Sequence, residues 1–211
     1  MVRKTKRNQL VMLAFVAELV VAITSVAGGT QPGVRSVDFA NHTYPIDRTL
    51  RDPRQPRSYV TLRAGETAET QRTIGMHLTH VVYCDVTGDG MEEAIVRLGI
   101  HTGGSSMPNA VYIFTWNKDR LKLLWAFITG DRADGGYRNV YADQGELVVE
   151  LYGKARKVGA NYNRGDEDLT PACCPKYYTR TRYRWDRGRF RQQGALVTLS
   201  NPDGHGSPAP Y

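Results

Sequence analysis

The sequence predicts a mainly β protein, an antiparallel meander of about eight or nine strands, with little helix outside an N-terminal export signal. Three observations predict this class. Short apolar or alternating runs recur between residues 57 and 186. Turn-forming residues separate them, in a chain with 21 glycines and 10 prolines. The one later stretch that could be helical, residues 66–73, lacks an apolar face with which a helix would pack. The sheet could close as a sandwich, stay open and curved, or form an incomplete propeller.

The expected elements follow from alternation and turn chemistry along the chain. The strands cover residues 36–44, 57–63, 78–83, 93–99, 110–116, 120–128, 137–142, 146–152 and 176–186, with a return segment at 189–191. Residues 28–35 are expected to form a linker, 36–195 a single β-rich domain, and 196–211 a flexible tail with proline, glycine and serine but few apolar residues.

The N-terminus has the pattern of a signal peptide. Four basic residues lie within positions 3–7, an apolar stretch over 10–23 is interrupted only by Glu18, and Ser-Val-Ala at 25–27 suits cleavage. An acid in the middle of a membrane helix costs about 2.5–3.5 kcal/mol on insertion scales, which argues against an uncleaved anchor. We therefore expect a signal peptide over residues 1–27, a periplasmic or extracellular protein, and no stable membrane span after cleavage.

The charge balance changes on cleavage. The full chain has a formal net charge of +7, of which residues 1–27 contribute +3 from four basic groups and one acid, leaving +4 for the mature protein. An exported, mildly basic protein gives no reason to expect a nucleic-acid partner. An anionic polymer of the cell envelope, or another exported protein, is the expected class of partner.

The segment from Asp85 to Glu93 is the clearest candidate site. Acidic or hydroxyl side chains alternate at Asp85, Thr87 and Asp89, a glycine permits a sharp turn, and an apolar strand follows. Calcium prefers several oxygen ligands, which such a loop supplies. We predict a structural calcium site formed by Asp85, Thr87, Asp89, the backbone carbonyl of Met91, and Glu93. The alternative is a turn capped by its own side chains without metal.

This loop resembles the short calcium loops of the FG-GAP, integrin-α-like and VCBS repeats, which follow the pattern D-x-D/N-x-D-G-x-x-D/E and enter a β-strand. Asp85, Asp89, Gly90 and Glu93 match the pattern, whereas Thr87 replaces a carboxylate or amide. The resemblance implies calcium binding, with an affinity that Thr87 would lower.

A longer resemblance, over residues 37–194, is to small bacterial exported proteins, some of them of the LppP/LprE lipoprotein type. The motifs that carry it are Tyr83–Gly90, Gly130–Gly136, Cys173-Cys174-Pro175 and Arg182–Asp186. It implies an exported β-rich domain and little about activity. No cysteine precedes Cys84, so the lipidated cysteine of true lipoproteins is not expected.

The three cysteines leave the disulfide pattern open. Export permits disulfides, and Cys84 could bond either Cys173 or Cys174, with the other left free. Cys173 and Cys174 could instead join in a strained vicinal ring, because adjacent Cα atoms are closer than disulfides prefer. The sequence favours a structural role for these cysteines, since it has no C-x-x-C motif.

Two further groups of residues suggest alternatives. On the expected strand 176–186, Arg180, Arg182 and Arg184 share one face and could bind an anionic polymer, since arginine suits bidentate contact with phosphate. His101 precedes a glycine-serine loop containing Ser105 and Ser106, which would suit a secreted hydrolase, but the G-x-S-x-G pattern is missing. His77 and His80, three apart in an extended strand, are expected on opposite faces.

These observations favour an exported, non-enzymatic β-domain with a calcium loop at 85–93. The arginine face offers an alternative role as an envelope-binding module, and the loop after His101 a second alternative as a hydrolase.

Overall fold

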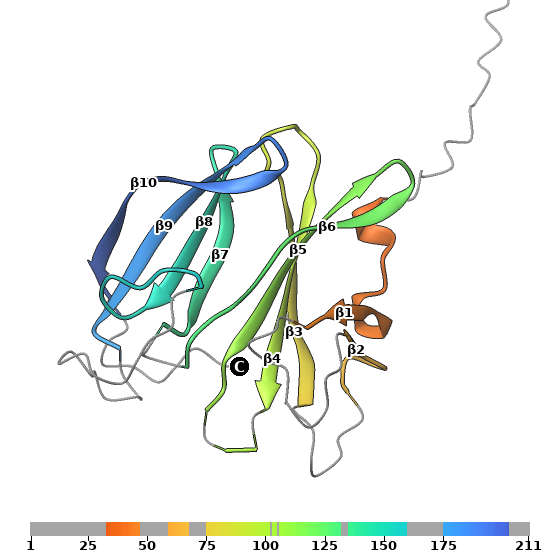
Figure 1. Cartoon of the computed structure of the whole chain (residues 1–211), viewed down its shortest axis with the longest axis horizontal. Coiled ribbons are helices and arrows are strands. Elements are labelled where there is room, and N and C mark those ends of the chain that lie inside the picture. Colours follow the sequence, from red (N-terminus) through yellow and green to blue (C-terminus); the bar gives the residue numbers. More distant parts are fainter. Residues whose placement is uncertain are drawn as a thin grey trace, which may run out of the picture. The chain divides into compact units, whose positions relative to one another are not determined.

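The computed structural model describes residues 33–46, 59–67, 75–101, 103–104, 106–131, 135–159 and 175–202. It confirms a mainly β protein, with ten antiparallel strands in three sheets (Figure 1). Two four-stranded meanders dominate, and a short hairpin accompanies the first. In the part of the chain that is described, no helix is long and apolar enough to cross a membrane.

The first meander runs in the order β3-β4-β5-β6. Its strands are β3 Gly75–Cys84, β4 Glu93–His101, β5 Asn109–Asn117 and β6 Arg120–Ile128. The second runs in the order β10-β9-β8-β7. Its strands are β7 Tyr137–Asp143, β8 Glu146–Tyr152, β9 Tyr177–Asp186 and β10 Arg189–Ser200. Every pairing described joins strands that are consecutive in the sequence, and two-residue turns connect β5 to β6, β7 to β8 and β9 to β10.

The two meanders pack face to face as a β-sandwich. One apolar core lies between them and takes Ile95, Val111 and Ile113 from the first sheet and Val149 and Leu151 from the second. Strand β3 lies beside β7 at one edge, and β6 lies beside β10 at the other. Of the three expected forms of closure, the sandwich is therefore the one observed.

A small N-terminal layer covers the opposite face of the first sheet (Figure 1). It consists of two 3₁₀ turns, η1 Val34–Ser36 and η2 Phe39–Asn41, and the hairpin of β1 Thr43–Pro45 with β2 Tyr59–Thr61. The layer encloses a second apolar core of the domain with residues of β4 and β5.

The expected strand over residues 36–44 is wrong for most of its length. Asp38 turns the chain here, because its carboxylate accepts hydrogen bonds from the backbone N–H groups of Ala40 and Asn41. The linker prediction is wrong at its end, since Val34 is 5% exposed and belongs to the core.

The expected flexible tail starts too early. Strand β10 continues to Ser200, and Val197 to Ser200 pair with Arg180 to Tyr177 of β9 beyond a shift in register. Backbone pairing does not require an apolar sequence, so the polar composition misled the prediction. The signal-peptide prediction at 1–27 lies outside the described residues.

Candidate functional site

The segment 85–93 forms the connection between β3 and β4. The Asp85 carboxylate accepts hydrogen bonds from the backbone N–H groups of Gly88 (2.6 Å) and Gly90 (2.9 Å). Asp89 Oδ1 accepts one from the N–H of Met91 at 2.9 Å. In these bonds the carboxylates of the loop accept from backbone N–H groups of the same loop, as expected for an acid-capped turn.

Glu93 is the exceptional residue of this loop. It is fully buried, with 0% exposure, at the start of β4. Its Oε2 accepts a hydrogen bond from the N–H of Val86 at 3.1 Å, while Oε1 has no hydrogen-bond partner within the described structure. Thr87 Oγ1 is also buried and, within the same described ranges, has no partner.

The environment of Glu93 opposes its negative charge. Burial raises its pKa above the usual carboxyl range, and the charges of Asp89 and Asp85 raise it further. Hydrogen bonding from the N–H of Val86 and from the nearby Thr115 hydroxyl acts in the opposite direction, although the Thr115 contact does not give Oε1 a partner with hydrogen-bond geometry. The loop therefore holds a buried carboxyl that favours either a proton or a compensating cation.

The fit of these residues to a metal ion is partial. Among the described residues, no group of three or more His, Cys, Asp or Glu side chains is arranged to hold a metal. Asp85 and Asp89 direct oxygens to loop amides, but an ionised carboxylate has about four lone-pair sites and keeps some free. Glu93 Oε1 and Thr87 Oγ1 are the oxygens with unused bonding capacity and no solvent.

The loop docks against the β7–β8 turn of the other sheet. A Cβ atom on Gly88 would lie 3.2 Å from the carbonyl oxygen of Gly145, and both glycines have positive φ, of 76° and 73°. Cys84 lies beside this contact, with its thiol close to the backbone of Ala142. Burial is the main cause that raises the pKa of the Cys84 thiol, which makes it a weak nucleophile.

Cys84 is a free, half-buried thiol in this structure. Cys173 and Cys174 lie outside the described residues, so both disulfide predictions stay predictions. The backbone carbonyl of Pro175, the residue after Cys174, accepts a hydrogen bond from the side chain of Asn201. This contact and Ala142 lie at opposite ends of the second sheet.

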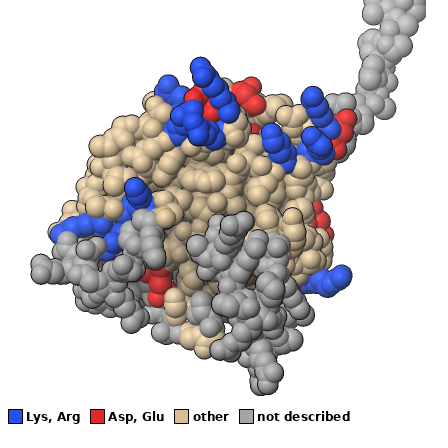
Figure 2. Space-filling view, in the orientation of Figure 1, with Lys and Arg blue, Asp and Glu red and all other residues tan. Residues whose placement is uncertain are grey.

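The arginine face on β9 exists as predicted, but each arginine is paired with an acid. Arg180 Nε donates to Glu150 at 2.8 Å, Arg182 contacts Asp143, and Arg184 donates to Glu146 at 2.8 Å. Figure 2 shows basic and acidic side chains interspersed at the end of the sheets where the β9–β10 hairpin lies. An anionic polymer would have to compete with these carboxylates.

Glu150 anchors this network and was not among the expected site residues. Its side chain is 2% exposed and contacts both Arg138 and Arg180. The sequence feature that could have identified Glu150 is an acidic residue inside the otherwise apolar strand 146–152. In the structure it pairs with Arg180 of β9. Each buried charge has a partner there, which is the usual condition for burying one.

The histidines depart from the prediction. A β-bulge between Leu78 and His80 shifts the register, so that His77 pairs with Gly99 and His80 with Arg97. Gly99 and Arg97 are two residues apart on one strand, so His77 and His80 share a face, and the expectation of opposite faces is wrong. His101 is exposed and stacks on His77 with 4.6 Å between ring centroids. Ser105 lies outside the described residues.

Comparison of the chain with protein-family models, with curated proteins and with solved structures finds no match.

Proposed function

We propose that this protein is an exported, non-enzymatic β-sandwich domain whose 85–93 loop binds a structural calcium ion. Export rests on the N-terminal sequence pattern. The observation that supports calcium is the fully buried carboxyl of Glu93, whose Oε1 lacks a partner in the described part of the chain, beside the acids Asp85 and Asp89.

The physical argument concerns the cost of burying a charge. An ionised carboxylate away from water costs several kcal/mol unless a cation or hydrogen bonds compensate it. Calcium accepts six to eight oxygen ligands in flexible geometry. Side-chain oxygens of Asp85, Thr87, Asp89 and Glu93, with the carbonyl of Met91 and water, would provide such a set.

The position of the loop explains what a bound ion would do. The loop leads into β4, an inner strand of the first sheet, and touches the second sheet through Gly88 and Gly145. A cation that neutralises Glu93 would therefore stabilise the start of an inner strand and the contact between the two sheets.

The test is a thermal melt of the full chain in about 10 mM calcium and in chelator. Extracellular calcium modules bind with dissociation constants of about 0.1–1 mM, and a ligand at 100 times its Kd stabilises by about 2.7 kcal/mol. For a domain of this size we expect Tm to rise by about 5–10 °C.

Three variants sharpen this experiment. Glu93→Gln preserves the shape and removes the charge, and Asp89→Ala removes a ligand, so both should abolish the calcium-dependent rise. Asp119→Asn, in the β5–β6 turn, removes an acid from another loop and should retain it. Equal melting in calcium and chelator, or a rise that survives Glu93→Gln, would rule the proposal out.

A further inference from the structure

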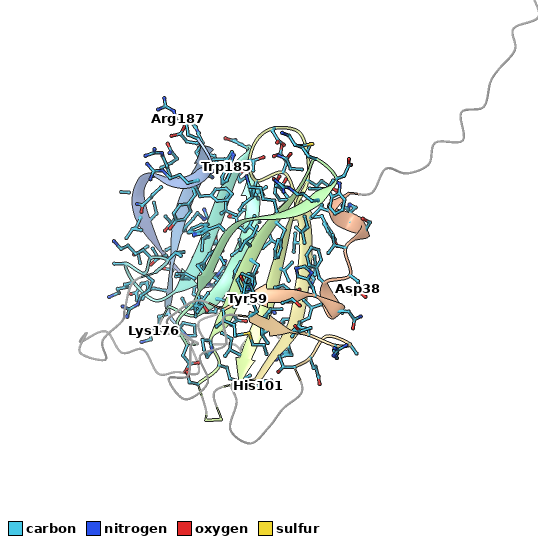
Figure 3. All side chains as sticks on the ribbon, turned by 45° about the vertical axis from the view of Figure 1, so that its right-hand side comes forward. Asp38, Tyr59, His101, Lys176, Trp185 and Arg187 are labelled. Carbon is cyan, nitrogen blue, oxygen red and sulfur yellow. The ribbon has the colours of Figure 1, made fainter. Side chains whose placement is uncertain are left out.

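A second cluster of polar side chains lies at the other end of the sheets, away from the calcium loop. Figure 3 shows His101 at one end of the domain and Trp185 and Arg187 at the opposite end. His77 stacks on His101 with an interplanar angle of 29°. The two histidines are on neighbouring strands, because Gly75 and His77 of β3 pair with His101 and Gly99 of β4.

Gly99 makes room for this arrangement. A Cβ atom at position 99 would overlap the imidazole ring of His77. Only a glycine lets the ring lie flat over β4, between Arg97 and His101, which point to the same side of the strand. The packing thus brings three cationic or titratable side chains to one face of the first sheet.

Three buried polar atoms in this cluster have no hydrogen-bond partner among the described residues. They are His77 Nδ1, Thr79 Oγ1 and Arg97 Nε. Thr79 is the extra residue of the bulge in β3, which with His80 lies opposite Arg97 of β4. The Arg97 guanidinium lies over the ring of Tyr137 of the second sheet, 4.5 Å from its centroid. Buried polar groups normally have a partner, and several unsatisfied ones in one place call for an explanation.

The chemistry of these atoms selects the class of ligand. The arginine Nε can only donate a hydrogen bond, the threonine hydroxyl can donate one, and a protonated imidazole donates from both nitrogens. The permanent positive charge of Arg97 disfavours a metal cation at the same place. We propose that His77, Thr79, Arg97 and His101 form a binding site for a small oxyanion of the sulfate, phosphate or carboxylate type.

The charges around His77 give the site a pH dependence. Burial is the main cause that lowers the pKa of His77, and the charges of His101 and Arg97 lower it further, while Glu66 from the segment after β2 raises it. His80 of β3 is exposed on the same face, and Tyr137 of β7 packs against Arg97. A bound anion favours the imidazolium, so binding takes up a proton and strengthens as the pH falls towards about 6, near the ordinary pKa of histidine.

The test follows the imidazole signals of the full chain by NMR during titration with sulfate, whose charge stays constant across the pH range in which histidine titrates. Chelator keeps the calcium loop out of the measurement. We expect the His77 and His101 signals to shift with saturation, and the affinity to be higher in mild acid, at about pH 6, than at about pH 8. A parallel titration with acetate distinguishes a carboxylate site from one for tetrahedral anions.

Two variants and one control complete the test. Arg97→Gln should weaken binding about tenfold or more, the value of a hydrogen bond to a charged group. Thr79→Val, which removes only a hydroxyl, should weaken it roughly two- to tenfold, and it serves if Arg97→Gln does not fold. Arg184→Gln, an exposed arginine at the opposite end, should leave the affinity unchanged. Unmoved imidazole signals, or an affinity that both site variants leave intact, would overturn the proposal.

Discussion

At the scale of single residues, His42 shows how a half-buried titratable group packs against aromatic rings of an apolar core. Its ring lies edge-on to Tyr44, with 5.0 Å between centroids, and to Phe114, at 5.5 Å. Burial among these rings lowers the pKa of His42 below its usual value of 6.5. The imidazole of His42 therefore stays neutral to a lower pH in the folded protein than in the unfolded chain.

This preference predicts a loss of stability in mild acid. Between the lowered pKa and 6.5 the unfolded chain binds more protons than the folded one, so the free energy of unfolding falls as the pH falls through that window. We expect His42 to contribute a decrease of Tm from about pH 7 to about pH 5, so that Tm falls less, or rises more, over this range in His42→Gln than in wild type. His80→Gln is the matched control, because His80 is exposed. An identical pH profile for wild type and His42→Gln would contradict the prediction.

The ion pairs of the β9 arginines show what can and cannot be predicted from the sequence of a single strand. Alternation along 176–186 places the arginines on one face correctly, because side-chain direction in a strand follows from parity alone. The partners of these arginines come from β7 and β8, which are distant in sequence, and Glu150 meets Arg138 and Arg180 only once three strands are aligned. Alternation along a strand predicts the side of the sheet to which each side chain points. It does not predict which residues of other strands contact that side chain.

At the scale of elements, two glycine turns hold the sheets together at one end. Gly88 in the β3–β4 loop and Gly145 in the β7–β8 turn approach closely enough that a side chain on either would crowd the other. Both have positive φ, a region that glycine adopts without steric cost. The close contact explains why glycine is suited to both positions.

We therefore expect Gly88→Ala to be more destabilising than a glycine substitution that involves backbone strain alone. The left-handed conformation costs roughly 1–2 kcal/mol for a residue with a Cβ, and the 3.2 Å approach to the Gly145 oxygen adds to it. Gly188→Ala is the matched control, since Gly188 has φ of 85° and a Cβ there would meet no described atom within 4 Å. Chemical denaturation measures both variants. Equal losses of stability would show that the contact between the turns contributes nothing.

The elements that were predicted well from sequence are those bounded by turn chemistry. The segment Asn117-Lys118-Asp119 and the glycines at 145 and 188 end strands because positive φ is needed there. Prediction failed where a local hydrogen bond overrode strand propensity, as at Asp38, and where the register changed inside a strand, as at the bulge before His80. A bulge depends on the partner strand, so the sequence of β3 alone does not reveal it.

At the scale of the whole domain, the first sheet is an inner layer. Strand β4 directs Ile95 to the second sheet and Val96 and Leu98 to the N-terminal layer. A strand buried on both faces is apolar throughout and loses the alternation that would indicate its covered side. For this reason the strands could be predicted, whereas the choice between a sandwich, an open sheet and a propeller could not.

The N-terminal layer should then be indispensable, although its described residues form just two short strands and two 3₁₀ turns. Phe39, 3% exposed, packs on Phe114 with 5.6 Å between ring centroids. The layer is also tied by hydrogen bonds from Tyr44 Oη to the carbonyl of Phe39 and from Tyr112 Oη to that of Pro45. A chain that begins at residue 68 would expose the buried face of the first sheet.

We expect that truncated chain to self-associate, because contiguous exposed apolar surface of this kind drives aggregation. A chain that begins at Gly28, and so lacks only the predicted signal peptide, is the control and should not show this additional self-association. Phe39→Ala is the milder test, with an expected cost of about 3–5 kcal/mol for removing a buried aromatic ring. Light scattering and binding of an apolar dye report self-association and exposure. A truncated chain that associates no more than the control and melts like it would mean that the first sheet needs no cover, and that the second core contributes little to the stability of the domain.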